Sequence, residues 1–185
     1  MTSQSEDVKV VVSAEQIQQR MRQMARQISD DYRGRTVAAV GVLEDGFIFM
    51  ADLVRQLDVP VTCQFIKPEH QELWRGNSQS EEIFFSPEVD VKNQHVLLVQ
   101  GLIETAVTTE FLVRNMLARG AKTVKVATLL DRGAARRVGL QPDYWGFQIE
   151  EGYVFGYGLG APQLKRNLPY VGTQVGVSIA ATPGT

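Results

Sequence analysis

VLLVQGLIETAVTTEFLVRNMLARG, residues 96–120, is the stretch of sequence that decides the fold. Residues 96–99 are aliphatic and partly β-branched, which is typical of a buried parallel strand. From Thr108 the apolar residues recur at helical spacing, and this pattern ends at Gly120, a residue type common just beyond helix ends. A strand, a tight loop and a helix in this order predict a phosphate site, because free N–H groups and the helix dipole point at the loop. A plain strand-to-helix connection capped by a threonine would give the same pattern.

Strand and helix patterns also alternate on both sides of this stretch. Ser13 followed by Gln16 predicts a capping box that opens a helix through about Asp31. The other expected elements are strands at 37–42, 59–66, 96–99, 123–130, 144–149 and 153–157, and helices at 46–57 and 109–119. Such alternation predicts βαβ units, an α/β fold and a mostly parallel sheet, whose ligands bind beyond the carboxyl ends of the strands.

Composition places the chain among ordinary globular proteins. Its 185 residues, 44% hydrophobic and 22% charged, fit one domain over residues 1–185 with loose ends at about 1–7 and 176–185. Residues 67–90 are polar and poorly periodic, which predicts a long loop or flap that carries an irregular hairpin. No apolar run approaches the roughly twenty residues of a membrane span, and the polar start does not have the pattern of a signal peptide.

Charge and cysteine content narrow the partners and the compartment. The net charge of −2 gives no general attraction to nucleic acid or to an anionic membrane. The single cysteine, Cys63, excludes an internal disulfide framework and suits a protein of the reducing cytoplasm. Because Cys63 lies in an apolar strand pattern, we expect it to be a buried structural thiol.

Residues 37–172 resemble the hypoxanthine-guanine phosphoribosyltransferases, which are type I phosphoribosyltransferases. The motifs that carry the resemblance are FMADL at 49–53, TLLD at 128–131, PDYWGF at 142–147, GYGL at 156–159 and RNLPY at 166–170. The resemblance implies a mainly parallel central sheet flanked by helices, with a small hood built from the segment after about Pro142. It also implies a purine-salvage reaction that moves ribose 5-phosphate from phosphoribosyl pyrophosphate to hypoxanthine or guanine with Mg²⁺.

The pyrophosphate loop, residues 44–46, departs from the family. The family's Lys-Gly pair, which meets the pyrophosphate, is matched here by Glu44 and Asp45, while Arg166 matches the family's pyrophosphate arginine. Two like charges about 4 Å apart cost on the order of 1 kcal/mol in water and several times more in a half-buried cleft. The resemblance therefore implies a poor pyrophosphate site, although Glu-Asp-Gly is also ordinary turn chemistry.

The phosphate loop, residues 100–108, has lost the acids by which the family grips the ribose hydroxyls. Gln100 and Gly101 stand in their places. The downstream acid, thought in the family to assist at the purine N7, is matched by Glu104, which makes it the one catalytic candidate. Glu104 is one methylene longer than the family's Asp, and a displacement near 1 Å can cost about a hundredfold in rate.

The remainder of the phosphate loop keeps part of the family pattern. Thr105 and Thr108 match it and can still bind a phosphate, together with the N-terminus of the following helix. Ala106 stands where the family has a glycine that lets the backbone approach the phosphate. Its Cβ disfavours the positive φ that such a turn requires.

The purine pocket is altered less evenly. The resemblance assigns base recognition to Arg132, stacking on the purine to Tyr153 and backbone contact with the base to Val154. Gly160 replaces an acid that helps to hold Mg²⁺ in the family, so no metal ligand is expected from the chain. Each of the three side chains could also be an ordinary rim residue. The family's mobile Ser-Tyr pair is absent from residues 67–71.

Three hypotheses for function remain open at this point. In the first, the chain is a pseudoenzyme of this family, needs no cofactor, and is retained as a binding, regulatory or oligomer-forming protein. The alternative is an active purine phosphoribosyltransferase, a glycosyltransferase that uses Mg²⁺. A third is a changed site that handles a purine nucleotide or another phosphorylated ligand through Thr105, Thr108 and Arg132. A homo-oligomer, dimer or tetramer, is expected in each case.

Overall fold

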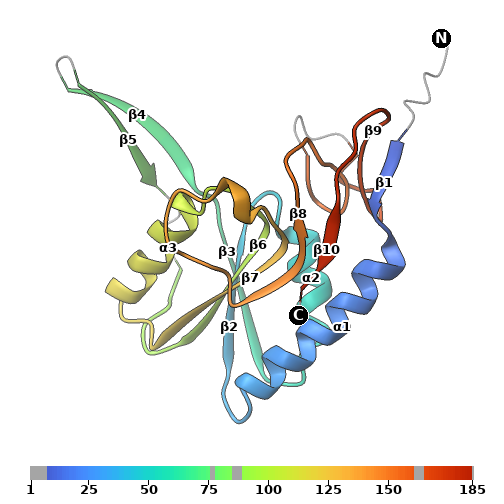
Figure 1. Cartoon of the computed structure of the whole chain (residues 1–185). Helices are drawn as coiled ribbons and strands as arrows, with labels where there is room; N and C mark the ends of the chain where they lie inside the picture. Colours follow the sequence, from blue (N-terminus) through green and yellow to red (C-terminus); the bar gives the residue numbers. More distant parts are fainter. Residues whose placement is uncertain (1–7, 76–77, 85–88, 161–164, 185) are drawn as a thin grey trace.

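The computed structural model describes residues 8–75, 78–84, 89–160 and 165–184, and a six-stranded sheet forms its centre (Figure 1). The strand order is β10-β8-β7-β6-β2-β3. The bounds are β2 (Val37–Val42), β3 (Val61–Ile66), β6 (His95–Ile103), β7 (Thr123–Asp131), β8 (Tyr144–Ile149) and β10 (Ala181–Pro183). All neighbours pair in parallel except β10 and β8. The predicted α/β fold with a mainly parallel sheet is confirmed.

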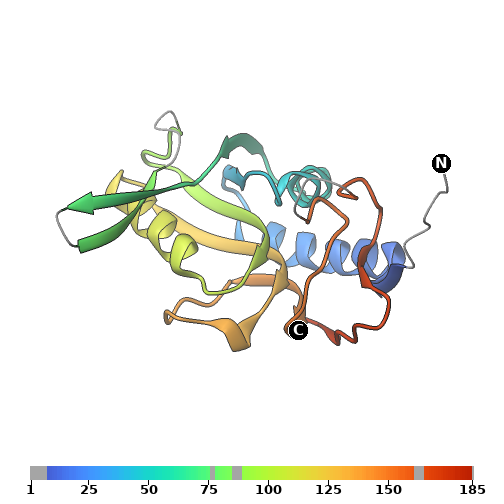
Figure 2. The ribbon, with the colours of Figure 1, turned by 90° about the horizontal axis from the view of Figure 1, so that it is seen from above.

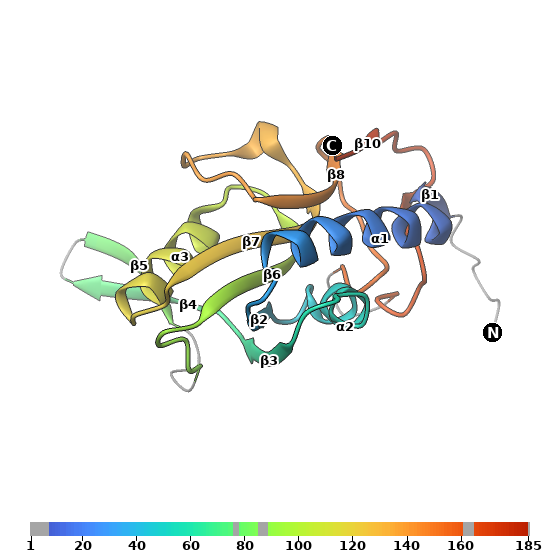
Figure 3. The same ribbon diagram turned by 90° about the horizontal axis from the view of Figure 1, so that it is seen from below.

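Helices cover both faces of this sheet. The helices are α1 (Ala14–Asp31), α2 (Phe47–Val54) and α3 (Val107–Ala118). Alternate side chains of β2 and β6 enter two separate apolar clusters, one shared with α1 and α2 and the other with α3. Figure 3 shows α1 and α2 side by side and α3 away from them. Because both faces are covered, the strands are continuous apolar runs.

The first helix follows the predicted pattern closely. The Ser13 hydroxyl accepts a hydrogen bond from the Gln16 N–H, and the Gln16 side chain accepts one from the Ser13 N–H, which completes the capping box. Its buried stripe contains Ile17, Met21, Met24 and Ile28, spaced three or four residues apart. The predicted α2 was longer at both ends than the observed one, and α3 begins two residues earlier than predicted.

The segment expected to hold an irregular hairpin forms a regular one. Strands β4 (Glu69–Arg75) and β5 (Ser78–Phe84) pair antiparallel without a register shift from Glu69↔Phe84 to Arg75↔Ser78. Figure 2 shows this hairpin projecting away from the central sheet. The low periodicity of its sequence hid the strands, because a two-stranded ribbon outside the core needs no continuous apolar face.

The hood has different boundaries from those expected. Strand β9 (Val171–Gln174) pairs antiparallel with β1 (Val8–Val12), so the N-terminal segment is part of it. Residues 144–149 are instead β8 of the central sheet, where they pair in parallel with β7. Residues 153–157 form no strand and make only two isolated bridges, Phe155 with Gly172 and Gly156 with Leu159. A local pattern shows that a segment is extended but not which sheet it joins.

Two smaller expectations are also corrected. The C-terminal segment is not loose throughout, because β10 pairs with the free edge of β8 and Ile179 is buried. Cys63 is exposed rather than buried, because β3 is the edge strand of the sheet. None of the helices in the described part of the chain is long and apolar enough to span a bilayer.

Candidate active site

Two neighbouring cavities lie beyond the carboxyl ends of the central strands. The first, of about 410 Å³, is lined by the phosphate loop from Gln100 to Thr109 and by Asp45 of the pyrophosphate loop. The second, of about 320 Å³, is lined by residues of the expected purine pocket. Asp45, Leu102 and Glu104 line both cavities, so the two are parts of one cleft. This is the location predicted for the ligands of a parallel sheet.

The phosphate loop keeps the conformation of a glycine turn without the glycine. Ala106, with φ 61° and ψ 6°, is left-handed and is the N-cap residue of α3. This conformation costs about 1 kcal/mol for a residue with a Cβ. Ala106 itself gives the helix no side-chain cap, but the Thr105 hydroxyl accepts a hydrogen bond of 3.4 Å from the Val107 N–H, so a threonine one position earlier caps the first turn, in line with the threonine-capped connection considered from the sequence. Thr105 and Thr108 line the cavity beside this helix start, as predicted for phosphate binding.

Gln100 lines the first cavity, and its side chain is tied to the fold. Its Oε1 accepts a hydrogen bond of 2.8 Å from the Thr109 hydroxyl, and both residues are buried. The contact fixes the end of β6 to the first turn of α3. Sequence reasoning missed Thr109, because a polar residue in a first helical turn is ordinary and its partner is nine positions away.

Gly101 brings the end of β6 against the pyrophosphate loop. A Cβ at this position would overlap the backbone carbonyl group of Asp45 and press on Leu159. No side chain fits there while the loop keeps this position. Gly101 and the backbone of the pyrophosphate loop are therefore in direct contact, so a side chain at position 101 would require the loop to move.

The two carboxylates of the pyrophosphate loop are paired with cations of the same chain. Arg166 Nη1 lies 2.9 Å from Asp45 Oδ1, and Arg166 Nη2 lies 3.5 Å from Glu44 Oε2. Lys67 Nζ lies 3.4 Å from Glu44 Oε1, and Arg166 also donates to the Gly158 carbonyl oxygen at 2.9 Å. Burial raises the pKa of the Asp45 carboxyl above its usual value, and the Arg166 guanidinium opposes that rise. The structure thus brings Glu44, Asp45 and Arg166 together, as the resemblance implied, but as partners of one another.

The purine pocket gathers the side chains expected there. Arg132, Tyr153, Val154 and Gly160 all line the second cavity. Arg132 is buried, donates to the carbonyl oxygen of Gly152 at 2.6 Å, and forms an ion pair with Glu104. Tyr153 is 49% exposed, so one of the expected stacking surfaces is open to solvent.

A second ion pair adjoins Glu104 and Arg132 without lining this pocket. Asp131 is 2% exposed and pairs with Arg136, which also donates to the Glu104 carbonyl oxygen at 2.6 Å. Burial raises the pKa of the Asp131 carboxyl, and Arg136 opposes the rise. Neither residue was identified from the sequence, although the TLLD motif that ends at Asp131 was part of the resemblance.

The carboxylates of the cleft do not form a metal site of their own. Within the described ranges, no group of three or more His, Cys, Asp or Glu side chains is arranged to hold a metal ion. Glu44 and Asp45 pair with Arg166, and Glu104 pairs with Arg132. Gly160 supplies no ligand, so these residues do not fit a Mg²⁺ ion held by the protein. For the side chains that the structure describes, a Mg²⁺ ion in the cleft would depend on oxygens that a bound ligand supplies.

Comparison with known proteins gives a consistent result. Residues 8–162 match the family model described as a phosphoribosyl transferase domain. The chain is 36% identical over 166 residues to a hypoxanthine-guanine phosphoribosyltransferase of Streptococcus pneumoniae, covering 89% of this chain and 91% of that protein. It is 34% identical over 164 residues to the bifunctional protein TilS/HprT of Listeria innocua, and there it spans only 25% of the relative's length.

Solved structures agree with the sequence relatives. A crystal structure of a hypoxanthine-guanine phosphoribosyltransferase from Bacillus anthracis superimposes with a TM-score of 0.81 at 30% identity. The match covers 91% of this chain and 99% of that one. Fold, order of motifs and length agree over almost the whole of both chains.

Proposed function

The chain belongs to the hypoxanthine-guanine phosphoribosyltransferase family, and from this premise we propose that it transfers ribose 5-phosphate from phosphoribosyl pyrophosphate to hypoxanthine or guanine. Relatives that match nearly the whole chain bear the name of this enzyme. They favour the active alternative over the pseudoenzyme hypothesis drawn from the substituted residues.

One observation carries the proposal, namely that the phosphate loop and the purine pocket open into one cleft. The 5′-phosphate fits beside Thr105, Thr108 and the start of α3, where N–H groups and the helix dipole favour an anion. The base fits against Tyr153 and Val154 in the adjoining cavity. The ribose then spans the junction, where the bond to C1′ is exchanged.

Two carboxylates, Asp45 and Glu104, line both cavities, and Glu104 is the one to which we assign the proton transfer. It lines both cavities, and its side chain is 48% exposed although it pairs with Arg132. In the proposed reaction a purine ring nitrogen attacks C1′, pyrophosphate leaves with the electron pair of the broken C–O bond, and Glu104 accepts the proton that the base loses. Arg132, held by the Gly152 carbonyl oxygen and Glu104, faces the base with its remaining donors.

A second candidate is nucleotide binding without transfer, and the pyrophosphate loop favours it. Arg166 is already occupied by Glu44 and Asp45, and Gly101 leaves no room for a ribose acid. A nucleoside monophosphate avoids this loop, whereas phosphoribosyl pyrophosphate has to displace its ion pairs. Under this candidate the protein senses or stores a nucleotide.

Product formation separates the two candidates. Purified protein with phosphoribosyl pyrophosphate, Mg²⁺ and hypoxanthine or guanine should form the nucleoside monophosphate in proportion to protein concentration. We expect Glu104→Gln to lower the rate by about a hundredfold, within the range for losing a general base. The matched control Glu110→Gln, which removes a carboxylate on α3 that pairs with Arg114, should keep the wild-type rate. No product above background from the wild type, with nucleotide still bound, would establish the second candidate instead.

The remaining features of the proposal concern the whole molecule. The chain is proposed to be one domain that forms a homo-oligomer, dimer or tetramer, in the cytoplasm. The edge strand β3, which has a free side in the single chain, is the place where we expect an oligomer contact. Light scattering across a range of protein concentrations tests the oligomer, and a monomer at all of them would contradict it.

A further inference from the structure

Another cavity, of about 490 Å³, lies at the amino-terminal ends of the parallel strands, opposite the candidate active site. It lies where β2, β3, β6 and β7 begin, at the lower end of the sheet in Figure 1. Val37 pairs with both Val61 and His95, and His95 pairs with Thr123, so the register brings these strand starts together. The polar side chains in its wall include Arg35, Thr36, Thr62, Gln94, His95 and Lys122.

Three basic side chains from separate parts of the chain line this cavity. Arg35 lies between α1 and β2, His95 is the first residue of β6, and Lys122 lies between α3 and β7. Burial lowers the pKa of the His95 imidazole, and the charges of Arg35 and Lys122 lower it further. Among the residues described, neither Arg35 nor Lys122 forms an ion pair with a carboxylate. Both cations are exposed, and within the described ranges the salt bridges leave them without a carboxylate partner.

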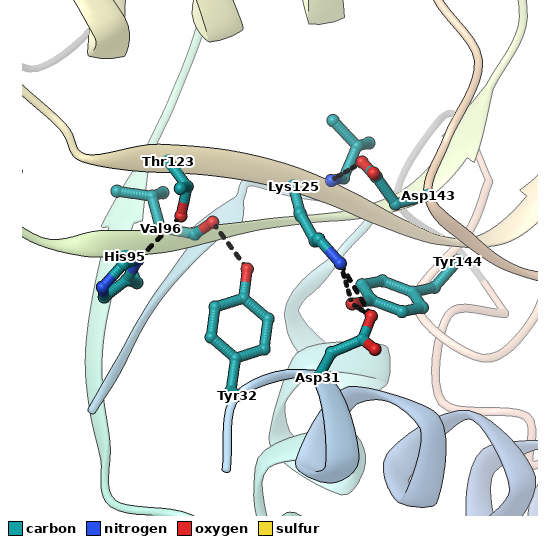
Figure 4. Close-up of polar contacts among 9 residues, drawn as sticks. Asp31, Tyr32, His95, Val96, Thr123, Lys125, Asp143 and Tyr144 are labelled. Carbon is teal, nitrogen blue, oxygen red and sulfur yellow. Dashed lines mark hydrogen bonds and ion pairs between the residues drawn. The ribbon is translucent and has the colours of Figure 1, made fainter. Parts of the chain in front are cut away.

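Asp31, the last residue of α1, is paired with other side chains. Asp31 Oδ2 lies 2.7 Å from Lys125 Nζ and accepts a hydrogen bond of 2.5 Å from the Tyr144 hydroxyl. Figure 4 shows Asp31 directed at this pair, while His95 is directed at Thr123. The Asp31 carboxylate therefore does not serve as the counter-charge of His95, Arg35 and Lys122.

His95 is held in a fixed orientation. Its Nδ1 is hydrogen-bonded to Thr123 Oγ1 at 2.9 Å, and its ring packs edge-on against Tyr32 with 6.4 Å between centroids (Figure 4). Tyr32 is fixed in turn, because its hydroxyl donates to the Val96 carbonyl oxygen. With Nδ1 engaged, Nε2 is the ring nitrogen left to bind a ligand.

We propose that this cavity binds a small phosphorylated anion with two or more negative charges, such as a diphosphate group. The Arg35 guanidinium offers a planar pair of donors, Lys122 a point charge, and Thr36 and Thr62 hydroxyl groups. The anion supplies the missing counter-charge and stabilises the imidazolium form of His95. The size of the cavity suits a small molecule. This site is independent of the proposed transfer reaction and lies at the other end of β6.

The experiment follows the imidazole resonances of His95 while inorganic pyrophosphate is added. The chain has two histidines, so His70→Asn leaves His95 as the single reporter. At neutral pH and constant ionic strength, pyrophosphate up to about 10 mM should shift these resonances toward the protonated form, with saturation near millimolar affinity. Because the reporter is local, pyrophosphate bound in the active-site cleft does not produce this signal.

Two double variants make the result specific. Arg35→Gln/Lys122→Gln should abolish the shift or weaken the affinity at least tenfold. Arg22→Gln/Arg26→Gln removes the same charge from the exposed side of α1 and should leave the titration unchanged. The proposal is overturned if pyrophosphate produces no saturating shift, if chloride at equal ionic strength produces the same one, or if Arg35→Gln/Lys122→Gln leaves it intact.

Discussion

The phosphate loop and the pyrophosphate loop have both lost residues of the family pattern, but the structural outcomes differ. The phosphate loop keeps its shape, because Ala106 adopts the left-handed conformation and Thr105 and Thr108 still line the cavity. The pyrophosphate loop keeps its place but its charges are satisfied internally, because Arg166 pairs with both of its carboxylates. The backbone of the phosphate loop thus keeps N–H donors that face the cavity, whereas Arg166, the cation beside the pyrophosphate loop, is paired with the protein's own carboxylates.

We expect the largest effect from a substitution at Gly101, where the phosphate loop contacts the pyrophosphate loop. Gly101→Asp restores the family's acid, but its side chain would collide with the backbone of Asp45. We expect a loss of about 1–3 kcal/mol in the free energy of unfolding, as for other overpacked sites, with no gain in transfer rate. Urea unfolding measures the loss.

Gly139→Asp is the control for that experiment, because nothing lies within 4 Å of a Cβ at Gly139. It should be nearly neutral. A Gly101→Asp variant as stable as the wild type and faster in transfer would show that the two loops are not coupled.

The ion pairs of the pyrophosphate loop give the next effect in size. Glu44→Lys/Asp45→Gly frees Arg166 and restores a cation, so phosphoribosyl pyrophosphate should bind on the order of tenfold more tightly. Glu44→Gln/Asp45→Asn removes the charges alone and should give a smaller gain. Asp30→Asn/Asp58→Asn, with the same change of net charge on exposed residues, should give none. Calorimetry measures all three, and equal gains in every variant would mean that only overall charge matters.

Ala106 gives the smallest effect. Ala106→Gly removes the left-handed strain and should raise the free energy of unfolding. The gain should not exceed about 1 kcal/mol, because glycine loses more chain entropy on folding and this loss opposes it. It should also raise the affinity for a nucleoside monophosphate a few-fold, because a glycine lets the backbone approach the phosphate closely. Ala118→Gly, near the end of α3, should instead destabilise by roughly 0.5–1 kcal/mol. Two changes of the same sign would argue against strain at Ala106.

Sequence alone predicted much of the fold and the location of the site. Strands 37–42 and 144–149 were predicted with the observed bounds, because each is a compact run with few alternatives. Ser13 and Gln16 fixed the start of α1 through contacts three residues apart. The position of the cleft followed from the parallel sheet and the order of motifs. These features depend on local pattern or on topology.

The missed features depend on contacts between distant residues. Cys63 was expected to be buried, but no local signal shows that β3 is an edge strand. The hydrogen bond from Thr109 to Gln100 and the packing of Gly101 against Asp45 appear only once the loops are placed. Glu44 and Asp45 were recognised as repulsive to pyrophosphate, but not as partners of Arg166.

A calorimetric comparison of inosine monophosphate with phosphoribosyl pyrophosphate, each with Mg²⁺, is the most direct test of this account. It asks whether the phosphate loop is available to a ligand while the ion pairs of the pyrophosphate loop obstruct one. The wild type should bind the monophosphate at least about tenfold more tightly, and Glu44→Lys/Asp45→Gly should narrow or reverse that order. Tighter binding of phosphoribosyl pyrophosphate by the wild type would contradict the account, because it would mean that Glu44, Asp45 and Arg166 do not obstruct the pyrophosphate.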